Sequence, residues 1–493
     1  GVRAVTVDAF TCQCVSDTLD GLRDGLSHFS GPSRAAVIYA IAPDDPVFIC
    51  DPQNLLRGHE PRFKELYLDN DQWRYHVPIS RDKNRFSYML PEKNLQLAGL
   101  ISCGGRSSSV FFQMWFTDHH PDMCSIGPTE RWLEHAAWRF SHDIANDREL
   151  YTGISGSFLR EFASHAVHDY IVDRMNVILG WDSDLRIYPI LDAVLGISRT
   201  REEQMMPRGE LVFVERPLLG SIDYLARFPE MEQPLLDNFK HVRKLLQAVE
   251  DSDRKLVSDG KNIVGINAGG RMPPFFLTAD FRGNFGFLRL NADEVVSFSD
   301  GIFKSTTRKA QLVQVEEALL EAELDPQIGS HLFKLTAALV HAAEESKSGC
   351  TLVIDLNHEP VIISGQKLAE SLDLRQPHLL ELAKSLSKVD GALHIGQDLR
   401  LHGFACLLDG RAIPGEDRAR GARFNSALRF TAERQNILVV VVSVDRPVAI
   451  IQEGVEISAQ CQWAPLTSCL FRPLTLEAWI GGKKSGILFS GTA

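Results

Sequence analysis

The sequence predicts a multidomain α/β protein. Its 493 residues exceed what one hydrophobic core usually serves, so roughly two to four domains are expected. The composition is typical of a soluble globular protein, with 44% hydrophobic and 24% charged residues. Strand-like apolar runs alternate with helical stretches along the chain, and this alternation is most regular after Asp325-Pro326.

Residues 1–125 are predicted to form an N-terminal α/β region. The apolar runs at 35–40 and 46–49 indicate strands, and Pro, Gly, Asp and Asn interrupt the pattern repeatedly. Residues 126–234 are predicted to be a helical and loop-rich connecting region. The helical part runs from Thr129 to about Met175, and the loop-rich part continues to Pro234.

Residues 235–326 are predicted to be a β-rich region that opens with a helix at 235–251. The Asp259-Gly260 pair is typical of a tight hairpin turn between two strands. An acidic amphipathic helix at 311–324 is expected to close the region. The predicted strands are 255–257, 263–266, 275–280, 285–290 and 295–298.

Residues 327–455 are predicted to form a compact α/β domain of ordinary size. The predicted helices are 331–346, 378–387 and 424–434, and the predicted strands are 351–354, 361–363, 401–408, 437–443 and 448–451, with one more strand after Asp390. Residues 456–493 match no pattern. We expect them either to cap the last sheet or to form a dispensable tail.

Charge and cysteine content exclude several classes of protein. The net charge is −12 and no long basic run is present, which argues against binding to nucleic-acid polymers or to an anionic membrane. The nine cysteines are scattered and form no Cys-x-x-Cys pair, so reduced thiols are expected. The chain shows no signal-peptide pattern and no apolar run of about 18 residues. We therefore expect a soluble, cytoplasmic protein.

The most informative residues are a carboxylate and an arginine-bearing glycine turn, about 30 residues apart. Asp390, followed by Gly391 and Ala392, offers oxygen ligands to a hard cation. Gly421 allows the backbone to approach a phosphate, and Arg423 offers it a planar fork of donors. This pattern predicts a site for a polyphosphate and its metal ion.

Each half of this pattern also has a structural interpretation. An Asp-Gly pair is more often a simple turn than a chemical site. The loop at Gly421 carries Arg418, Arg420 and Arg423, and a solvated basic turn would explain these residues equally well. If the loop opens a helix, however, its N–H groups and the positive end of the helix dipole face an anion.

In order and spacing, these motifs resemble those of the diadenylate cyclase domain, a nucleotidyltransferase that condenses two ATP into cyclic di-AMP. That family carries an Asp-Gly-Ala motif and then a Gly-Thr-Arg-His-Arg motif before a helix, followed by a strand that ends in Ser. Asp390-Gly391-Ala392 matches the first motif, Gly421 and Arg423 match part of the second, and Ser443 matches the strand-end serine. Segments 350–354 and 361–364 resemble the opening strands of the family, and helix 331–346 resembles its leading helix.

The resemblance implies a mixed-sheet domain flanked by helices, with two copies meeting face to face and each holding one ATP. Asp390 is then the metal ligand for Mg²⁺ or Mn²⁺, and Asp390 and Arg423 are the catalytic residues. The implied nucleotide-binding residues are Gly391, Ala392, Gly421, Ala422, Asn425, Ser426 and Ser443. The implied partners are ATP or a cyclic dinucleotide and a second copy of this domain.

Three positions depart from the family pattern. Ala422 replaces its Thr, Phe424 replaces its His, and Asn425 replaces its second Arg. Each lost charge-assisted hydrogen bond is worth roughly 1.5–3 kcal/mol. Arg418, Arg420 or Arg429 are candidates to substitute for the lost cation. The alternative is a catalytically degenerate domain that senses a nucleotide or a cyclic dinucleotide.

The N-terminal part is similar to the probable sensor region, of the DACNV kind, that precedes such cyclase domains. The similar segments are 58–61, 241–246 and 251–260. The resemblance implies an N-terminal regulatory region of unspecified ligand, and a purely structural α/β scaffold is the alternative.

Other motifs predict less. The segment 118–122 with Cys124 fits no zinc spacing, so a polar loop is expected there. His165 and His168 fall on one face of a helix without an obvious third ligand. Neither a phosphate-binding P-loop nor a Gly-x-Ser-x-Gly hydrolase turn is present.

Overall fold

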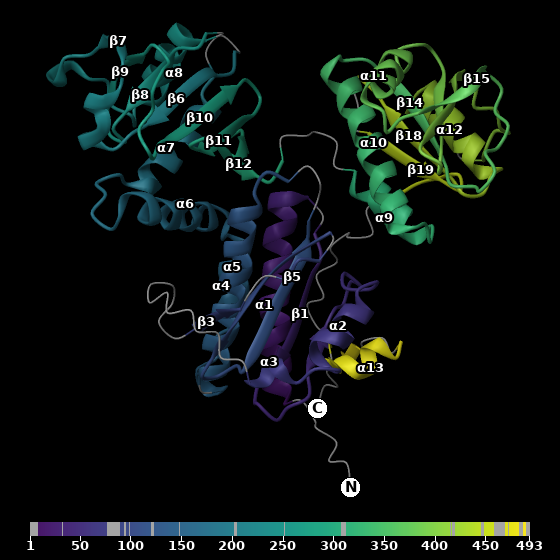
Figure 1. The fold of residues 1–493 in the computed structure, drawn as a ribbon, viewed down its shortest axis with the longest axis horizontal. Coiled ribbons are helices and arrows are strands. Elements are labelled where there is room, and N and C mark those ends of the chain that lie inside the picture. Colours follow the sequence, from purple (N-terminus) through teal and green to yellow (C-terminus); the bar gives the residue numbers. More distant parts are fainter. Residues whose placement is uncertain are drawn as a thin grey trace. The chain divides into compact units, whose positions relative to one another are not determined.

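The structure is a computed structural model, and it divides into two compact units. The first unit comprises residues 1–307 and 463–493, and the second comprises residues 308–462. Figure 1 shows the elements of both units. The residues that the structure describes are 8–31, 33–75, 89–92, 95–97, 99–119, 123–146, 148–201, 205–250, 252–306, 312–414, 416, 420–444, 448–457, 469–471, 473–482 and 487–489.

The first unit contains a six-stranded antiparallel sheet in the order β22-β2-β1-β5-β4-β3. Its strands are β1 (Ala35–Ala40), β2 (Phe48–Cys50), β3 (Met89–Glu92), β4 (Leu100–Ser107), β5 (Phe112–Asp118) and β22 (Leu474–Thr475). The helices around it are α1 (Ala9–Ser30), α2 (Glu60–Tyr67), α3 (Gln72–Tyr75), α4 (Ile126–Ala145), η1 (Arg148–Leu150), α5 (Ile154–Arg160), α6 (Ala163–Leu179) and α13 (Leu476–Ile480).

Strand β1 is apolar throughout because both faces of this sheet are covered. Val37 and Tyr39 point into one core with Trp132 of α4, whereas Ile38 points into another with Phe63 of α2. An uninterrupted apolar run is the sequence pattern of such a doubly covered strand.

Residues that follow the second unit in sequence complete this first sheet. Strand β22 pairs with β2, and helix α13 follows it at once. Trp479 of α13 is buried against Phe63, with a ring-centroid distance of 6.3 Å. Arg57 lies 4.2 Å above the indole and donates a 2.9 Å hydrogen bond to the Trp479 carbonyl. Residues 474–480 of the C-terminal extension are thus built into the N-terminal sheet and its core.

The first unit also contains an eight-stranded sheet in the order β13-β12-β11-β10-β6-β8-β9-β7. Its pairs are antiparallel except β6–β8. The strands are β6 (Arg208–Phe213), β7 (Tyr224–Arg227), β8 (Lys255–Ser258), β9 (Ile263–Asn267), β10 (Leu277–Arg282), β11 (Gly286–Leu290), β12 (Asp293–Ser299) and β13 (Ile302–Lys304). Its helices are α7 (Ile187–Arg199), η2 (Arg216–Ser221), η3 (Glu230–Glu232), α8 (Phe239–Leu246) and η4 (Gln247–Val249). A separate two-stranded ribbon joins β21 (Cys469–Phe471) to β23 (Ile487–Phe489).

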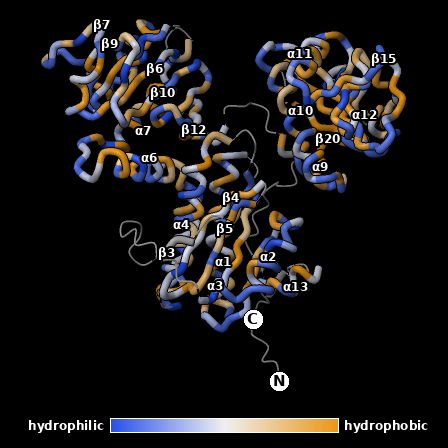
Figure 2. Tube along the Cα trace, in the orientation of Figure 1, coloured by the Kyte–Doolittle hydropathy of each residue, from blue (hydrophilic) through white to orange (hydrophobic). Residues whose placement is uncertain are grey.

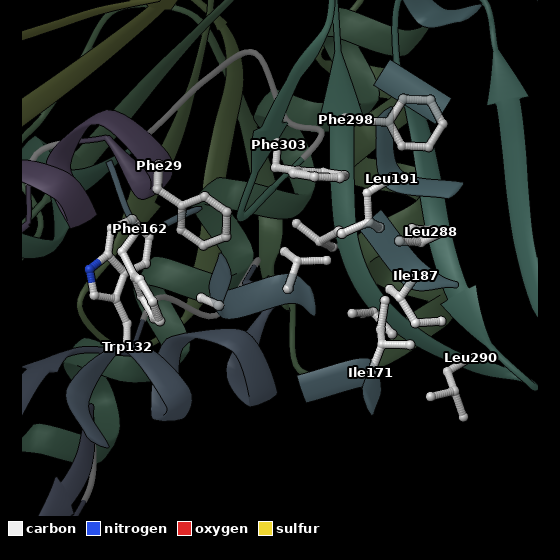
Figure 3. Close-up of a cluster of buried hydrophobic side chains, with 14 of the residues drawn as sticks. Phe29, Trp132, Phe162, Ile171, Ile187, Leu191, Leu288, Leu290, Phe298 and Phe303 are labelled. Atoms are coloured by element: carbon white, nitrogen blue, oxygen red, sulfur yellow. The ribbon is translucent and has the colours of Figure 1, made fainter. Parts of the chain in front are cut away.

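One hydrophobic cluster links the helices of the first sheet to the second sheet. Phe29 of α1 and Trp132 of α4 belong to the same cluster as Leu191 of α7 and Phe298 of β12 (Figure 3). The segment after Met175 was predicted to be loop-rich, but it holds α7, β6 and β7. Pro189 lies in the first turn of α7, where proline is tolerated, and so it does not mark a loop.

The second unit is a seven-stranded mixed sheet in the order β15-β17-β16-β14-β18-β19-β20. Only β14 and β16 run parallel. The strands are β14 (Cys350–Asp355), β15 (Gln366–Asp373), β16 (Ala392–Gly396), β17 (Arg400–Cys406), β18 (Ile437–Val442), β19 (Ala449–Gln452) and β20 (Val455–Glu456). The helices are α9 (Val313–Glu321), α10 (Pro326–Glu345), α11 (Pro377–Leu386) and α12 (Ala422–Ala432).

Helices cover both faces of this sheet. Leu352 and Val440 pack with α9 and α10 on one face, and Val353 and Val439 pack with α12 on the other. Hydrophobic residues gather along the interior strands of both units (Figure 2). The predicted fold class, an α/β protein whose C-terminal domain has a mixed sheet flanked by helices, is confirmed.

The predicted strand at 361–363 is wrong. The Val361 N–H donates instead to the buried carboxylate of Asp355 (2.7 Å), and Ile362 is exposed. The edge strand is β15, which the sequence did not reveal because its mostly polar side chains are largely exposed. In the described part of the chain, no helix has both the length and the apolar character needed to cross a membrane.

Candidate functional site

Three adjacent strand ends define one edge of the seven-stranded sheet. β14 begins at Cys350, β16 begins at Ala392, and β18 ends at Val442. Because β14 runs parallel to β16 and antiparallel to β18, these three ends lie at the same edge. Asp390 and Ser443 lie just outside the strands there, which brings together two of the predicted site residues.

Asp390 presents a solvent-exposed carboxylate at this edge. Its side chain is fully exposed, and its Oδ1 lies 3.9 Å from Nη2 of Arg423. The next residue, Gly391, has φ of 108°, and a Cβ there would lie 2.5 Å from the Ala405 carbonyl carbon. Gly391 therefore makes the turn for reasons of both backbone conformation and space. The structure brings the predicted carboxylate and guanidinium together.

Arg423 lies in the first turn of α12. The helix begins after Gly421, which has φ of 90° and ψ of 164° and no side chain that could cap the helix. A Cβ at Gly421 would meet nothing within 4 Å among the described atoms, so only the backbone conformation calls for glycine. The N–H groups of the first turn and the positive end of the helix dipole lie beside the guanidinium. This arrangement suits an anion.

Two of the departures from the family pattern are buried. Phe424 packs in the core beneath α12, and Asn425 is only 7% exposed. By contrast, the Arg423 side chain is 47% exposed. Ala392, another predicted site residue, is also buried in this core. Its side chain and those of Phe424 and Asn425 face the protein interior.

The arginines proposed as substitutes have other partners. Arg420 lies 4.0 Å above the Phe424 ring and forms a 2.8 Å ion pair with Glu456. Arg429 donates a 2.8 Å hydrogen bond from Nε to Glu416 and forms a second contact with the same carboxylate. Arg418 lies outside the described residues. Arg420 and Arg429 are thus engaged with Glu456 and Glu416 and not with Asp390.

The remaining predicted residues lie near the start of α12 or the end of β18. Ala422 is exposed at the first position of α12, and Ser426 is half-buried one turn later. Ser443 is half-buried directly after β18. Sequence reasoning missed Gly349, which precedes β14 and touches the Arg423 side chain. Its only signal in the sequence is a glycine immediately before a buried strand.

A second polar pair lies at the opposite end of β14 and was not predicted. His394 Nε2 lies 2.8 Å from Oδ2 of Asp355, and both residues are buried. Burial raises the pKa of Asp355, but hydrogen bonds from His394, Val361 and Asn357 outweigh it and hold the pKa below its ordinary value. This pair ties down the loop after β14.

The weaker N-terminal candidates also have structural partners. Asp118 pairs with Arg34 at 2.7 Å, and Cys124 Sγ donates to the Ser305 carbonyl. His165 and His168 share one face of α6, as predicted, and both contact Tyr188. Residues 120–122 lie outside the described residues. The described residues contain no group of three or more His, Cys, Asp or Glu side chains placed to hold a metal ion.

Three family models match successive parts of the chain. Residues 9–181 match the "Probable sensor domain DACND", and residues 188–296 match the "Probable sensor domain DACNH". Residues 337–456 match the DAC model, described as "DisA bacterial checkpoint controller nucleotide-binding". No curated protein matches the chain.

Two solved structures are similar to parts of the chain. A hypothetical membrane spanning protein from Bacillus cereus is 19% identical over 27% of this chain and 69% of its own, with a TM-score of 0.22. A double mutant of DacA from Staphylococcus aureus is 16% identical over 26% of this chain and 89% of its own, with a TM-score of 0.20. These likenesses are too distant to add to the argument.

The resemblance identified from the Asp390 and Gly421 motifs is confirmed. The chain carries a nucleotide-binding domain of the diadenylate cyclase type at residues 337–456, preceded by two probable sensor domains.

Proposed function

We propose that the C-terminal domain condenses two ATP into cyclic di-AMP with release of pyrophosphate, under the control of the N-terminal sensor region. The observation that supports this most is the exposed Asp390 carboxylate, 3.9 Å from Arg423 at the edge where α12 begins. A cation ligand and a phosphate ligand side by side are the minimum that a metal–nucleotide complex requires. A cytoplasmic location, where ATP is available, follows from the proposal.

The donor set at this edge fits a divalent metal such as Mg²⁺ or Mn²⁺. Asp390 is an exposed carboxylate, and Mg²⁺ is commonly held by one or two carboxylates together with water and substrate phosphates. When bound, the cation polarises the phosphate and lowers the pKa of the attacking hydroxyl. Asp390 is the residue that would hold it.

The protein side of the reaction is positioning and charge compensation. The 3′-hydroxyl of each ATP attacks the α-phosphorus of the other, so a new P–O bond forms, a proton is released, and pyrophosphate leaves. Arg423 offsets charge on the phosphoryl oxygens, and the N–H groups at the start of α12 add fixed dipoles. One domain supplies one Asp390 and one Arg423, so the proposed reaction needs two copies of this domain.

The alternative function is nucleotide or cyclic-dinucleotide binding without turnover. The burial of Phe424 and Asn425 favours it, because these positions carry a His and an Arg in the family pattern. A missing charge-assisted contact worth about 1.5–3 kcal/mol corresponds to a loss of about 10- to 150-fold in the step that uses it.

A single assay on the full chain distinguishes the two functions. The protein is incubated with ATP and Mg²⁺ or Mn²⁺, and cyclic di-AMP is measured by mass spectrometry, with Asp390→Asn as the control. Product that disappears in the variant supports the cyclase. ATP that raises the melting temperature without product supports the binding protein. If the protein forms no product and is stabilised neither by ATP nor by cyclic di-AMP, both functions are contradicted.

A further inference from the structure

Gly349 lies directly beneath the Arg423 side chain. A Cβ built on Gly349 would lie 2.1 Å from Nη1 of Arg423 and 3.0 Å from its Cζ. Carbon atoms do not approach nitrogen this closely, so no side chain fits at 349 while Arg423 keeps its position. The guanidinium occupies the space that a side chain would take.

Backbone conformation does not explain this glycine. The φ of Gly349 is outside the left-handed region, unlike those of Gly391 (108°) and Gly421 (90°). The backbone of Gly349 therefore lies outside the left-handed conformation that favours glycine. What distinguishes the position is therefore the guanidinium that lies against it.

We propose that Gly349 is a positioning residue, which holds the Arg423 guanidinium beside Asp390 by leaving room for it against the start of β14. This inference rests on the proposed function, in which Arg423 contacts the nucleotide phosphates. A methyl group at 349 displaces the guanidinium from the place it shares with Asp390. Gly349 itself touches no ligand and acts through Arg423.

The structure also indicates that this displacement leaves the fold intact. The atom that a methyl group would meet first is the end of a flexible side chain that is 47% exposed, and it can swing into solvent. The next neighbour is the Val442 carbonyl oxygen at 3.2 Å, which needs to yield by only a few tenths of an ångström. Alanine also restricts the unfolded chain more than glycine does, which favours folding. A Gly349→Ala variant should therefore fold normally and bind poorly.

The size of the binding loss follows from the chemistry of the arginine. A guanidinium recognises phosphate through two parallel hydrogen bonds whose geometry is fixed by its planar fork. Losing a charge-assisted contact of this kind weakens binding by about tenfold to a hundredfold. We expect Gly349→Ala to weaken ATP binding about tenfold to a hundredfold.

The test measures ATP binding to the full chain by calorimetry in Mg²⁺, with adenosine as a second probe. The variants are Gly349→Ala, Arg423→Ala and the double variant, with Gly329→Ala in α10 as the matched control, since a Cβ there meets nothing within 4 Å. We expect Gly349→Ala to weaken binding of ATP but not of adenosine, and to add nothing in the Arg423→Ala background. Gly329→Ala should bind both ligands as the wild type does, and neither it nor Gly349→Ala should lower the melting temperature.

Two outcomes would overturn the inference alone. Gly349→Ala could bind ATP as tightly as the wild type while Arg423→Ala binds weakly, or it could weaken ATP and adenosine equally in both backgrounds. If the wild type does not bind ATP, or if Arg423→Ala binds it normally, the proposed function fails and the inference fails with it.

Discussion

Replacing Trp479 by alanine should destabilise the N-terminal unit, although Trp479 follows the nucleotide-binding domain in sequence. Its indole is 1% exposed and packs against Phe63 and beneath Arg57. Removal of a buried Trp side chain costs about 3–5 kcal/mol through lost burial and the cavity left behind. Part of this loss comes from the stacking of Arg57, which is worth about 0.5–2 kcal/mol. The expected loss is a large fraction of the stability of a typical domain, which is about 5–15 kcal/mol.

The assay is urea unfolding combined with hydrogen exchange measured on peptides. Exchange should rise in β1 and β2, which share a sheet with β22, and should stay unchanged in β14 and β18. Trp181→Ala is the matched control, because this tryptophan belongs to the same unit and is 67% exposed. Its replacement should change stability by less than about 0.5 kcal/mol.

The reasoning would be refuted by equal midpoints for the Trp479 and Trp181 variants. It would also fail if exchange rose in β14 rather than in β1, because Trp479 would then support the second unit.

Three further predictions concern single residues. Burial raises the pKa of Asp51 to about 6, against the hydrogen bonds from Leu56 and Leu55, so its ionised form is disfavoured in the folded state. The stability of the first unit should therefore fall by about 3 kcal/mol as pH rises from about 3 to 7, and urea midpoints should show this component missing in Asp51→Asn. Gly391→Ala should lower stability by about 1–3 kcal/mol in thermal unfolding, since φ of 108° and the contact with Ala405 both oppose a side chain. Ala422→Arg, at an exposed position beside Arg423, should tighten ATP binding in a titration by up to about tenfold at low salt, with a smaller gain in high salt.

The sequence was most informative where local chemistry decides the structure. The Asp325-Pro326 pair marks the start of α10: the Asp325 side chain accepts from the Gln327 and Ile328 N–H groups, and Pro326 occupies the first position. Its interpretation as a domain boundary was wrong, because the second unit already begins at residue 308 and α9 packs in the core of that unit. The run at β18 was predicted within a residue because all six of its side chains are buried.

Long-range pairings were not accessible in the same way. Strand β22 has only two residues, and its place beside β2 is set by the burial of Trp479 rather than by any pattern of its own. Strand β15 lies at an edge, is largely exposed, and carries a register shift between Lys367 and Leu372, so it shows no alternation to detect. Such elements are specified by their partners, which a single sequence does not identify.

The sequence likewise predicted some features of the candidate site and not others. The proximity of Asp390 and Arg423 followed from two motifs and the order of the strands, and the structure gives it as 3.9 Å. The burial of Phe424 and Asn425 did not follow, because a helix start gives no indication of which residues turn inward until the sheet beneath it is known. The role of Gly349 depends on a contact between residues 74 positions apart and is invisible in the sequence.

Three glycines shape this one edge, each for a different physical reason, and the differences can be separated by experiment. Gly391 needs glycine for both its backbone conformation and its close approach to Ala405, Gly421 for its backbone conformation alone, and Gly349 for the space that Arg423 fills. Alanine should therefore destabilise the fold most at 391, less at 421 and least at 349. Alanine at 349 should weaken ATP binding through Arg423 even though it leaves the fold intact, because it displaces the guanidinium without unfolding the protein.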